Sequence, residues 1–291
     1  MKIQYLNGGL ANQVFQYIFA RYVQLSSPNQ EPCYLDDSFF FVNQVHNGYE
    51  LEKVFGIKPL LLSELLDSDV WEMVIENKRN GISVPQTLKN LGFSVSLITE
   101  TDNYKELNPF DGKVLPIPCN AYHPEILNYS DEITYYHGYW LHPAWLQKYK
   151  SILKQELRFP DILSEQNLTY LQKIQSSLSV AVHIRRGDYV TLGWTSSNQF
   201  YQEQISQVAH KHPDACFFLF SDDIAWCKEN AASLGLTTTI DITYVEGNTS
   251  GNNYIDLQLM SQCQLLIAGK SAFAYLARLL NSQIKESHFD T

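Results

Sequence analysis

The sequence predicts an α/β protein made of two units. The 291 residues are more than one compact domain usually holds and enough for two, each with its own core. Short apolar runs bounded by polar turn residues alternate with helical patterns, as buried parallel strands and their helices do. Residues 158–161 read Arg-Phe-Pro-Asp, which is typical of a connector. The expected units are therefore residues 1–160 and 161–291.

The chain opens with a strand, a glycine turn and a helix. Residues 3–6 form a short apolar run, residues 7–9 read Asn-Gly-Gly, and residues 11–25 carry apolar side chains at helical spacing. This βα start is typical of an open α/β sheet. The glycines allow a tight turn and close approach of a ligand, although the GxGxxG dinucleotide pattern is absent. We expect a cleft-lining loop that includes Gly8, Gly9, Asn12 and Gln13.

The first half also contains a sequence that matches a metal motif. Asp67-Ser68-Asp69 fits the DxD pattern of some transferases, but it falls within residues 61–75, which carry a helical pattern. Carboxylates on the outer face of a helix are usually solvated. We therefore predict a solvated helix face here and no metal site, and we assign no function to most of residues 34–118.

The second half alternates more regularly. The expected strands are residues 178–184, 216–220 and 265–268, and the expected helices are residues 164–176, 200–210, 226–234 and a last one ending near 280. A polar cluster directly follows each strand: Arg185/Arg186/Asp188, Asp222/Asp223 and Lys270/Ser271. Ligands of doubly wound sheets bind outside the carboxyl ends of the strands. Three such clusters predict one ligand-binding crevice in this half.

The first cluster is a pair of adjacent arginines, Arg185 and Arg186, followed by Gly187. A guanidinium fork matches phosphate oxygens and stays charged at any relevant pH, so the pair is suited to a phosphate. The alternative is an arginine pair that forms salt bridges on a surface loop.

The second cluster is Asp222-Asp223. A carboxylate at a strand end can accept both N–H donors of a guanine edge or hold a ribose hydroxyl. The alternative is an N-cap for the next helix, for which aspartate is well suited.

The third cluster, Gly269-Lys270-Ser271, is not a P-loop. That motif needs a glycine five residues before Gly269, and Gln264 stands there. A turn with exposed N–H groups at a helix start remains, and such a turn attracts phosphate.

Bulk properties exclude several classes of protein. A formal charge of −10 argues against a nucleic-acid binder. The five cysteines are scattered without a CxxC pair, which indicates reduced thiols in a cytoplasmic protein. No apolar run is long enough for a signal peptide or a membrane helix, and the histidines lack metal-ligand spacing.

Several sequence blocks resemble one family, the bacterial α-1,2-fucosyltransferases of glycosyltransferase family 11. Residues 8–17, GGLANQVFQY, are similar to its opening GGLxNQxFQY, and residues 183–190, HIRRGDYV, are similar to its HxRRGDYV block. Residues 138–140 (GYW), 221–227 (SDDIAWC) and 256–263 (DLQLMSQC) continue the series in the family order.

The last block departs from the family pattern. The family has histidine, asparagine and two tryptophans where this chain has Leu265, Lys270, Tyr275 and Leu276, whereas Ser271 and Phe273 are kept. Another GDP-deoxysugar therefore stays an alternative donor.

The resemblance implies a GT-B-like architecture, in which two Rossmann-like domains face a cleft. It implies an acceptor-side domain in residues 1–160 and a GDP-sugar-binding domain in residues 161–291. The implied reaction is metal-independent, inverting transfer of fucose from GDP-fucose to the 2-hydroxyl of a galactoside, with no cofactor.

Roles follow for the clustered residues. Negative charge grows on the β-phosphate as GDP leaves, and Arg185 is the candidate to meet it, helped by Arg186 or the Lys270/Ser271 turn. By analogy with related fucosyltransferases, His183 and Asp222 or Asp223 would hold the guanosine, and Phe273 completes the expected donor site. Asp188 is a candidate general base, with orientation of Arg185 as the alternative.

The resemblance also implies partners and a location. The acceptor would be a glycan, lipid-linked or free, in surface-glycan or O-antigen synthesis, with the protein cytoplasmic or peripheral at the inner membrane and not inserted. Two further alternatives stay open: a non-catalytic GDP-sugar-binding protein, and a Rossmann oxidoreductase, against which the missing GxGxxG counts.

Overall fold

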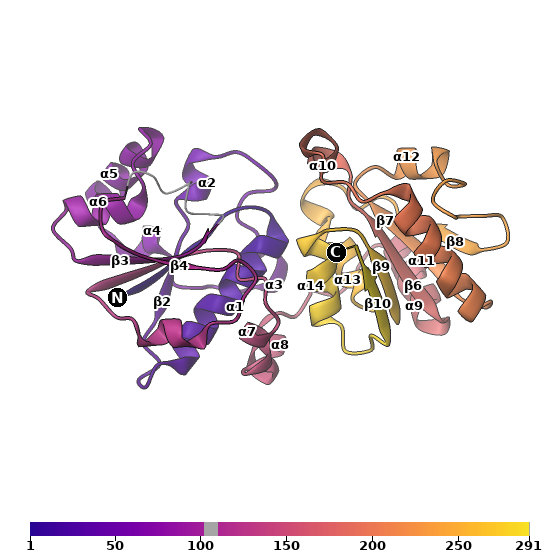
Figure 1. Cartoon of the computed structure of the whole chain (residues 1–291), viewed down its shortest axis with the longest axis horizontal. Coiled ribbons are helices and arrows are strands. Elements are labelled where there is room, and N and C mark those ends of the chain that lie inside the picture. Colours follow the sequence, from indigo (N-terminus) through magenta and orange to yellow (C-terminus); the bar gives the residue numbers. More distant parts are fainter. Residues whose placement is uncertain (102–109, 291) are drawn as a thin grey trace. The chain divides into compact units, whose positions relative to one another are not determined.

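The computed structural model describes residues 1–101 and 110–290. The chain forms two compact units, Met1–Phe159 and Pro160–Thr291 (Figure 1). The boundary lies one residue before the position expected from the sequence. Each unit contains one five-stranded parallel sheet.

The sheet of unit 1 has the strand order β2-β1-β5-β3-β4. Its strands are β1 (Lys2–Tyr5), β2 (Cys33–Asp36), β3 (Val95–Glu100), β4 (Lys113–Ile117) and β5 (Ile133–His137). All neighbouring pairs are parallel, so the strands end at one edge of the sheet. β1 lies in the interior of the order, which explains why its short run Ile-Gln-Tyr is buried.

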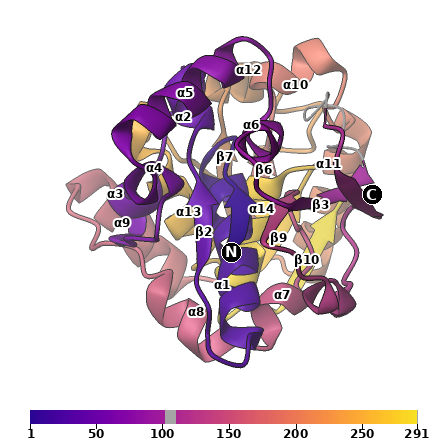
Figure 2. The same cartoon turned by 90° about the vertical axis from the view of Figure 1, so that its left-hand side faces the viewer.

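Helix α1 (Leu10–Ser26) follows β1 and packs against β1 and β2 (Figure 2). Its apolar side chains are buried on several sides, including Phe19, which stacks on Trp140 with ring centroids 4.0 Å apart. The other helices of unit 1 are α2 (Phe39–Val42), α3 (Leu51–Phe55), α4 (Leu62–Leu65), α5 (Ser68–Arg79), α6 (Val84–Asn90), η2 (Pro124–Asn128), α7 (Ala144–Gln147) and α8 (Lys150–Glu156).

The helix predicted over residues 61–75 is wrong in one respect, because the chain forms two helices there. α4 ends at Leu65, and α5 begins at Ser68 after the N-cap residue Asp67. Asp67 and Asp69 therefore flank a helix start, where negative charge is favoured by the helix dipole. Both side chains are exposed.

The sheet of unit 2 has the order β10-β9-β6-β7-β8. Its parallel strands are β6 (Ser179–Ile184), β7 (Cys216–Ser221), β8 (Asp241–Tyr244), β9 (Leu265–Ala268) and β10 (Glu286–Phe289). The three strands predicted from apolar runs are β6, β7 and β9, and they are neighbours at the centre of the sheet. The predicted Rossmann-like pattern of this half is therefore confirmed.

The helices of unit 2 are α9 (Glu165–Ser176), α10 (Gly187–Leu192), α11 (Asn198–Lys211), α12 (Ile224–Glu229), η3 (Ser250–Asn252), α13 (Tyr254–Met260) and α14 (Ala272–Leu280). Serine side chains cap α9, α11 and α14, as serine at an N-cap position predicts. The helix expected over residues 226–234 is shorter than predicted, because α12 ends at Glu229 and the chain then turns through Gly235, whose φ is +81°.

The two faces of β6 have different neighbours. Val180, Val182 and Ile184 pack with Tyr201 and Ile205 of α11 in the core of unit 2. Because side chains alternate along a strand, His183 points to the opposite face. Within the described part of the chain, none of the helices combines the length and apolar character needed to cross a bilayer.

Candidate functional site

Three neighbouring strands of unit 2 end at one edge of the sheet, as the sequence predicts. Ile184 of β6 is in register with Ser221 of β7, and His183 of β6 is in register with Ala268 of β9. The polar clusters that follow these strands therefore begin side by side. We call this group of residues, at the carboxyl ends of β6, β7 and β9, the strand-end site.

Arg185 is held between two carboxylates. Its Nη2 donates to Oδ1 of Asp188 at 2.6 Å, and its Nη1 lies 2.7 Å from Oδ2 of Asp222. These contacts engage two of the five N–H groups of the guanidinium. Within the described structure the remaining three have no protein acceptor. The side chain as a whole is 32% exposed, so the guanidinium lies at the surface of the site.

Asp222 binds the arginine loop with both of its oxygens. Oδ2 contacts Arg185, while Oδ1 accepts the main-chain N–H of Arg186 at 2.8 Å. This approach requires a glycine at residue 187, because a Cβ there would lie 2.6 Å from Oδ2. Asp222 therefore fixes the guanidinium and the main chain of the loop together. This geometry does not present the free carboxylate edge that the sequence suggested for binding a guanine.

Arg186 is held on the other side of the loop. Its guanidinium carbon lies 3.5 Å from the ring centroid of Trp226, and its Nε contacts Oδ2 of Asp223 at 3.3 Å. Asp223 also caps α12, because its Oδ1 accepts the N–H of Trp226 at 3.1 Å. The cap that the sequence left as an alternative for this cluster is therefore present, and it coexists with the contact to Arg186.

The charges of the strand-end site are nearly balanced. Two arginines face three carboxylates, and Lys270 adds a cation at the end of the next strand. An anion would therefore be bound by directed N–H groups more than by an excess of positive charge. Preorganised donors of this kind are well suited to charge that develops during a reaction.

His183 lies on β6, two residues before Arg185, and it is 6% exposed. Burial, together with the nearby charge of Arg185, lowers the pKa of the imidazole to about 3, so the ring is neutral. Among the described residues Nδ1 has no hydrogen-bond partner, and the ring lies 5.9 Å from that of Phe273. A buried polar atom without a partner is costly, and a ligand or water would satisfy it.

Tyr201 of α11 joins two of the strand ends. Its hydroxyl donates to the carbonyl of His183 at 3.2 Å and accepts the N–H of Gly269 at 3.1 Å. Burial raises the pKa of this hydroxyl, which therefore keeps its proton. The neighbouring Ser196 accepts the N–H of Lys270 at 3.3 Å. Both hydroxyls require Gly269, since a Cβ there would lie within 2.5 Å of them.

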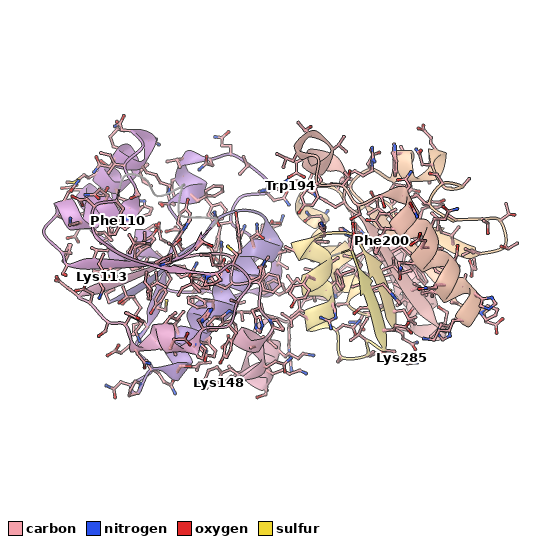
Figure 3. All side chains as sticks on the ribbon, viewed as in Figure 1. Phe110, Lys113, Lys148, Trp194, Phe200 and Lys285 are labelled. Carbon is pink, nitrogen blue, oxygen red and sulfur yellow. The ribbon has the colours of Figure 1, made fainter. Side chains whose placement is uncertain are left out.

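Ser271 and Lys270 belong to the turn after β9. The hydroxyl of Ser271 caps α14 by accepting the N–H of Ala274 at 3.4 Å, and the side chain of Lys270 is exposed. The loop before α11 contacts this turn through Ser196 and contains Trp194, which is 57% exposed (Figure 3).

The glycine loop of unit 1 follows β1. Gly8 has a φ of +76°, and a Cβ there would lie 2.5 Å from Nδ2 of Asn12. Gly9 is the N-cap residue of α1 and forms no side-chain cap, and a Cβ at Gly9 would come within 3.5 Å of the ring of His46. Gly8 is therefore required by the left-handed backbone of the turn, whereas a Cβ at Gly9 would make only an ordinary contact with His46.

Gln13, which the sequence assigned to the same loop, is a buried support. Its Nε2 donates to the carbonyls of Gly8 and Gly48 at 3.0 and 2.9 Å, and its Oε1 accepts the N–H of Glu50 at 2.9 Å. Its side chain is fully buried. Gln13 thus joins two loops by their main chains, and its amide is not directed toward a ligand.

The strand-end site includes residues that the sequence did not single out. Trp226, Tyr201 and Ser196 each hold a predicted residue in place. Trp226 lies in the SDDIAWC block and could have been named from it. The hydroxyl of Tyr201 could not, because both of its partners are main-chain atoms of distant strands.

Metal ligation was not predicted at any position of the chain. Across residues 1–101 and 110–290, no group of three or more His, Cys, Asp or Glu side chains is arranged to hold a metal ion.

Comparison with solved structures concerns the fold. The fucosyltransferase NodZ from Bradyrhizobium has a TM-score of 0.51 and 14% sequence identity, with 96% of this chain and 92% of that chain covered. This likeness and the two parallel sheets confirm the expected GT-B-like class with two Rossmann-like domains.

Comparison with protein sequences identifies the family. The sequence model described as Glycosyl transferase family 11 matches residues 100–285. The alpha-1,2-colitosyltransferase of Escherichia coli is 24% identical over 278 residues, which cover 93% of this chain and 84% of that protein. The O-antigen biosynthesis glycosyltransferase WbnK of Escherichia coli is 25% identical over 296 residues, covering 95% and 89%. Because the family model extends over well more than half of the chain and includes the whole strand-end site, the chain belongs to glycosyltransferase family 11.

Proposed function

We propose that this glycosyltransferase moves L-fucose from GDP-fucose to the 2-hydroxyl of a galactoside, with inversion at the anomeric carbon. The observation that carries the proposal is Arg185, which has three N–H groups available and is fixed by Asp188 and Asp222. The α-1,2 linkage is supported by the name of the colitosyltransferase relative and by the motif resemblance.

The proposed reaction is a direct displacement. The bond between the anomeric carbon and the β-phosphate oxygen breaks while the acceptor oxygen bonds to the same carbon. Arg185 donates to the β-phosphate oxygens as they gain charge, and Arg186 and the turn of Lys270 and Ser271 add further donors. GDP leaves with the electron pair of the broken bond.

The acceptor hydroxyl must lose a proton, and we assign this proton to Asp188. Asp222 already orients Arg185 with both of its oxygens engaged. Asp188 uses only Oδ1 for Arg185 and is 49% exposed, so Oδ2 can accept the proton. In this proposal Asp188 both contacts Arg185 through Oδ1 and takes the proton with Oδ2.

The nucleoside of the donor would lie on the face of β6 that points away from α11, where the His183 side chain lies. His183 is neutral and has an unpartnered Nδ1, and Phe273 lies beside it. We propose that these two side chains contact the guanosine. Asp223 supports this region through Arg186 and α12.

We propose that no metal is needed, because arginine N–H groups take the role that a divalent cation has in other transferases. The acceptor is proposed to be a surface glycan, as the name of the O-antigen relative suggests, and a lipid-linked glycan would bring the protein to the inner membrane surface.

The test is GDP release from GDP-fucose in EDTA, with and without β-galactoside acceptors. Acceptor-dependent release with the wild type, and none with Arg185→Ala, is the expected result. Release that requires a divalent metal would remove the proposed role of the arginines. Fucosylated product analysed by NMR would report the linkage and the anomeric configuration.

A second donor is favoured by two observations. The relative that matches 93% of the chain is a colitosyltransferase, and the last sequence block departs from the fucosyltransferase pattern at Lys270. The same assay with other GDP-deoxysugars decides between the donors. Turnover with GDP-colitose and none with GDP-fucose would replace the first proposal and leave the roles of the arginines unchanged.

A further inference from the structure

The exposed apolar side chains of unit 2 gather on one segment, residues 190–194. Among the described residues of this unit, five large apolar side chains are exposed, and three of them are Val190, Leu192 and Trp194, each at least half exposed. The segment includes the end of α10, the helix that begins two residues after Arg185. Apolar side chains that are exposed together beside a ligand site commonly contact a ligand.

Trp194 is held in a fixed position. Its main-chain N–H donates to the carbonyl of Tyr189 at 2.9 Å, and Gly193, with a φ of +69°, ends α10 and turns the chain. Two residues later, Ser196 accepts the N–H of Lys270 at 3.3 Å. The segment that carries Trp194 is therefore anchored to α10 on one side and to the turn after β9 on the other. A ligand that binds to a fixed group has less ordering to impose, which favours binding.

The indole ring of Trp194 has an open face. Its ring meets that of Tyr189 edge-to-face, with centroids 5.6 Å apart, and such a contact covers at most one of its two faces. Because the residue is 57% exposed, the other face is open. The ring of Tyr189 also lies 5.5 Å from the guanidinium carbon of Arg185. One aromatic ring therefore separates the indole from the proposed phosphate donor.

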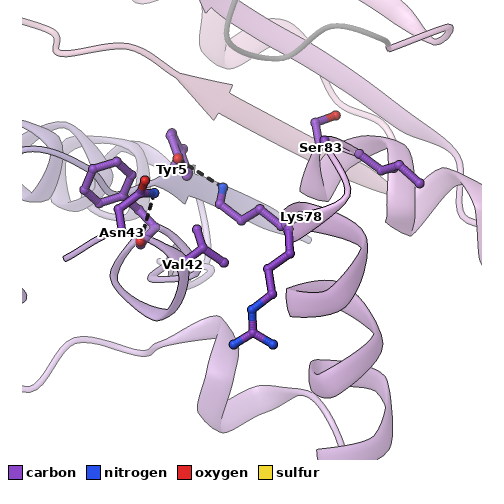
Figure 4. Close-up of a pocket in the computed structure, with 9 residues that line it drawn as sticks. Tyr5, Val42, Asn43, Lys78 and Ser83 are labelled. Atoms are coloured by element: carbon purple, nitrogen blue, oxygen red, sulfur yellow. Dashed lines mark hydrogen bonds between the residues drawn. The ribbon is translucent and has the colours of Figure 1, made fainter. Parts of the chain in front are cut away.

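The aromatic side chains at a cavity of unit 1 are engaged instead by the protein. This cavity of about 410 Å³ has Tyr5 and Phe39 among its lining residues, and Figure 4 shows the ammonium of Lys78 directed at Tyr5. Tyr5 is buried, with Nζ of Lys78 at 4.5 Å from its ring centroid and with Phe39 packed edge-to-face on it at 6.4 Å. Of these two places, the segment of Trp194 is the one that offers a ligand an open aromatic face.

We propose that Trp194 is a stacking platform for a pyranose ring of the acceptor. The C–H groups on the apolar face of the sugar lie on the electron-rich face of the indole. A sugar is favoured over a hydrocarbon because Arg185 and Asp188 lie next to Tyr189, and a hydrocarbon would remove water from these charged groups at a high cost. Sugar hydroxyls can bond to them. That the sugar is the acceptor rests on the proposed function, whereas the platform does not.

The test is saturation-transfer NMR with methyl β-galactoside as the probe and GDP present. With the wild type, we expect saturation mainly at the C–H groups of one sugar face. Trp194→Ala should weaken galactoside binding about five- to tenfold, and Trp194→Phe, which keeps an aromatic face, should stay within about threefold of the wild type. Leu163→Ala is the matched control, because Leu163 is an 87% exposed side chain of the same unit outside the segment, and it should change nothing.

Three results would overturn the platform: saturation spread evenly over both sugar faces, no galactoside binding by the wild type, or undiminished binding by Trp194→Ala. Vesicles of zwitterionic phospholipid are the second probe. Vesicle binding that Trp194→Ala removes would assign the segment to lipid and also overturn the platform. GDP affinity, measured on the same samples, should stay within about twofold in all variants, because the platform contacts the sugar alone. A wild type that binds the galactoside in this way but releases no GDP from GDP-fucose would contradict the proposed function and leave the platform in place.

Discussion

The two sheets end in polar side chains, but they use them differently. In unit 2, the side chains after β6 and β7 bind mainly each other, since Arg185 and Arg186 are held by Asp188, Asp222 and Asp223. In unit 1, two polar side chains near the corresponding edge, Gln13 and Glu100, bind main-chain atoms. Gln13 holds the loops at Gly8 and Gly48, and Glu100 at the end of β3 accepts the N–H groups of Asn120, Tyr139 and Trp140.

The difference separates residues that act on a ligand from residues that fix a frame. A charged group held by other side chains keeps donors free for a ligand, as Arg185 does. A buried amide or carboxylate that satisfies main-chain groups has none left, and its loss destabilises the fold. Motif residues of the two kinds look equally important in a sequence, and substitutions tell them apart.

The largest effect is expected for Arg185→Ala. We expect kcat to fall at least about a thousandfold, because the charge on the departing phosphate loses its main donor. The melting temperature should change little, since the side chain is partly exposed. Arg278→Ala, an exposed arginine of α14, is the control and should keep full activity. GDP release by the wild type and both variants is the measurement, and an active Arg185→Ala enzyme would contradict the mechanism.

For Gln13→Ala we expect the opposite result: a less stable fold with ligand binding retained. Loss of three buried hydrogen bonds to the main chain should lower the free energy of unfolding of unit 1 by about 3 kcal/mol. GDP affinity should stay within about twofold of the wild type. Denaturant unfolding and GDP titration measure the two quantities. Gln199→Ala removes an exposed glutamine and should change neither; a Gln13→Ala protein that is stable but inactive would place Gln13 in the site after all.

His183 should make stability depend on pH. Its pKa in the folded protein is about 3, below the ordinary value of 6.5, so the unfolded chain binds the proton more readily. The stabilisation is complete above about pH 6.5 and is lost as the pH falls toward 3. The free energy of unfolding should therefore fall with decreasing pH, and His183→Asn should reduce that fall by about 1–2 kcal/mol at pH 5. Urea unfolding at pH 5 and 8 measures it, with the exposed His210→Asn as control.

The sequence predicted the centre of unit 2 well and its edges poorly, for a physical reason. β6, β7 and β9 are buried on both faces and appear as apolar runs. The edge strands β8 (Asp-Ile-Thr-Tyr) and β10 (Glu-Ser-His-Phe) are half-exposed and carry no such run. The same applies to β4 of unit 1, which contains a proline and is partly exposed.

The site follows the same rule. Arg185 and Asp222 could be predicted because each directly follows a buried strand. The support given by Gln13 could not, because its partners Gly48 and Glu50 lie 35 and 37 residues away. Whether a polar side chain faces a ligand or a main-chain group is decided by tertiary contacts that no local pattern contains.

Asp222→Asn should have a moderate effect. Its Oδ1 can still accept the N–H of Arg186, but the amide loses the charge that holds Arg185. We expect kcat/KM to fall about thirtyfold, which corresponds to roughly 2 kcal/mol. Asp241→Asn breaks an exposed ion pair with Lys173 in the same unit and should change kcat/KM less than about twofold. Equal losses in both variants would mean that Asp222 acts through stability and not through Arg185.

The smallest effect is expected for Tyr201→Phe, which keeps the ring in the core and removes the hydroxyl between β6 and β9. The N–H of Gly269 then loses its partner, and the turn that follows it is less firmly placed. We expect GDP affinity to fall about five- to tenfold while guanosine affinity stays unchanged, because only the phosphate donors are displaced. Tyr170→Phe is the matched control: that hydroxyl also donates to a carbonyl, at Tyr244, but away from the strand ends. Isothermal titration with both ligands separates the outcomes, since a general loss of stability would weaken GDP and guanosine alike, whereas a displaced turn weakens GDP alone.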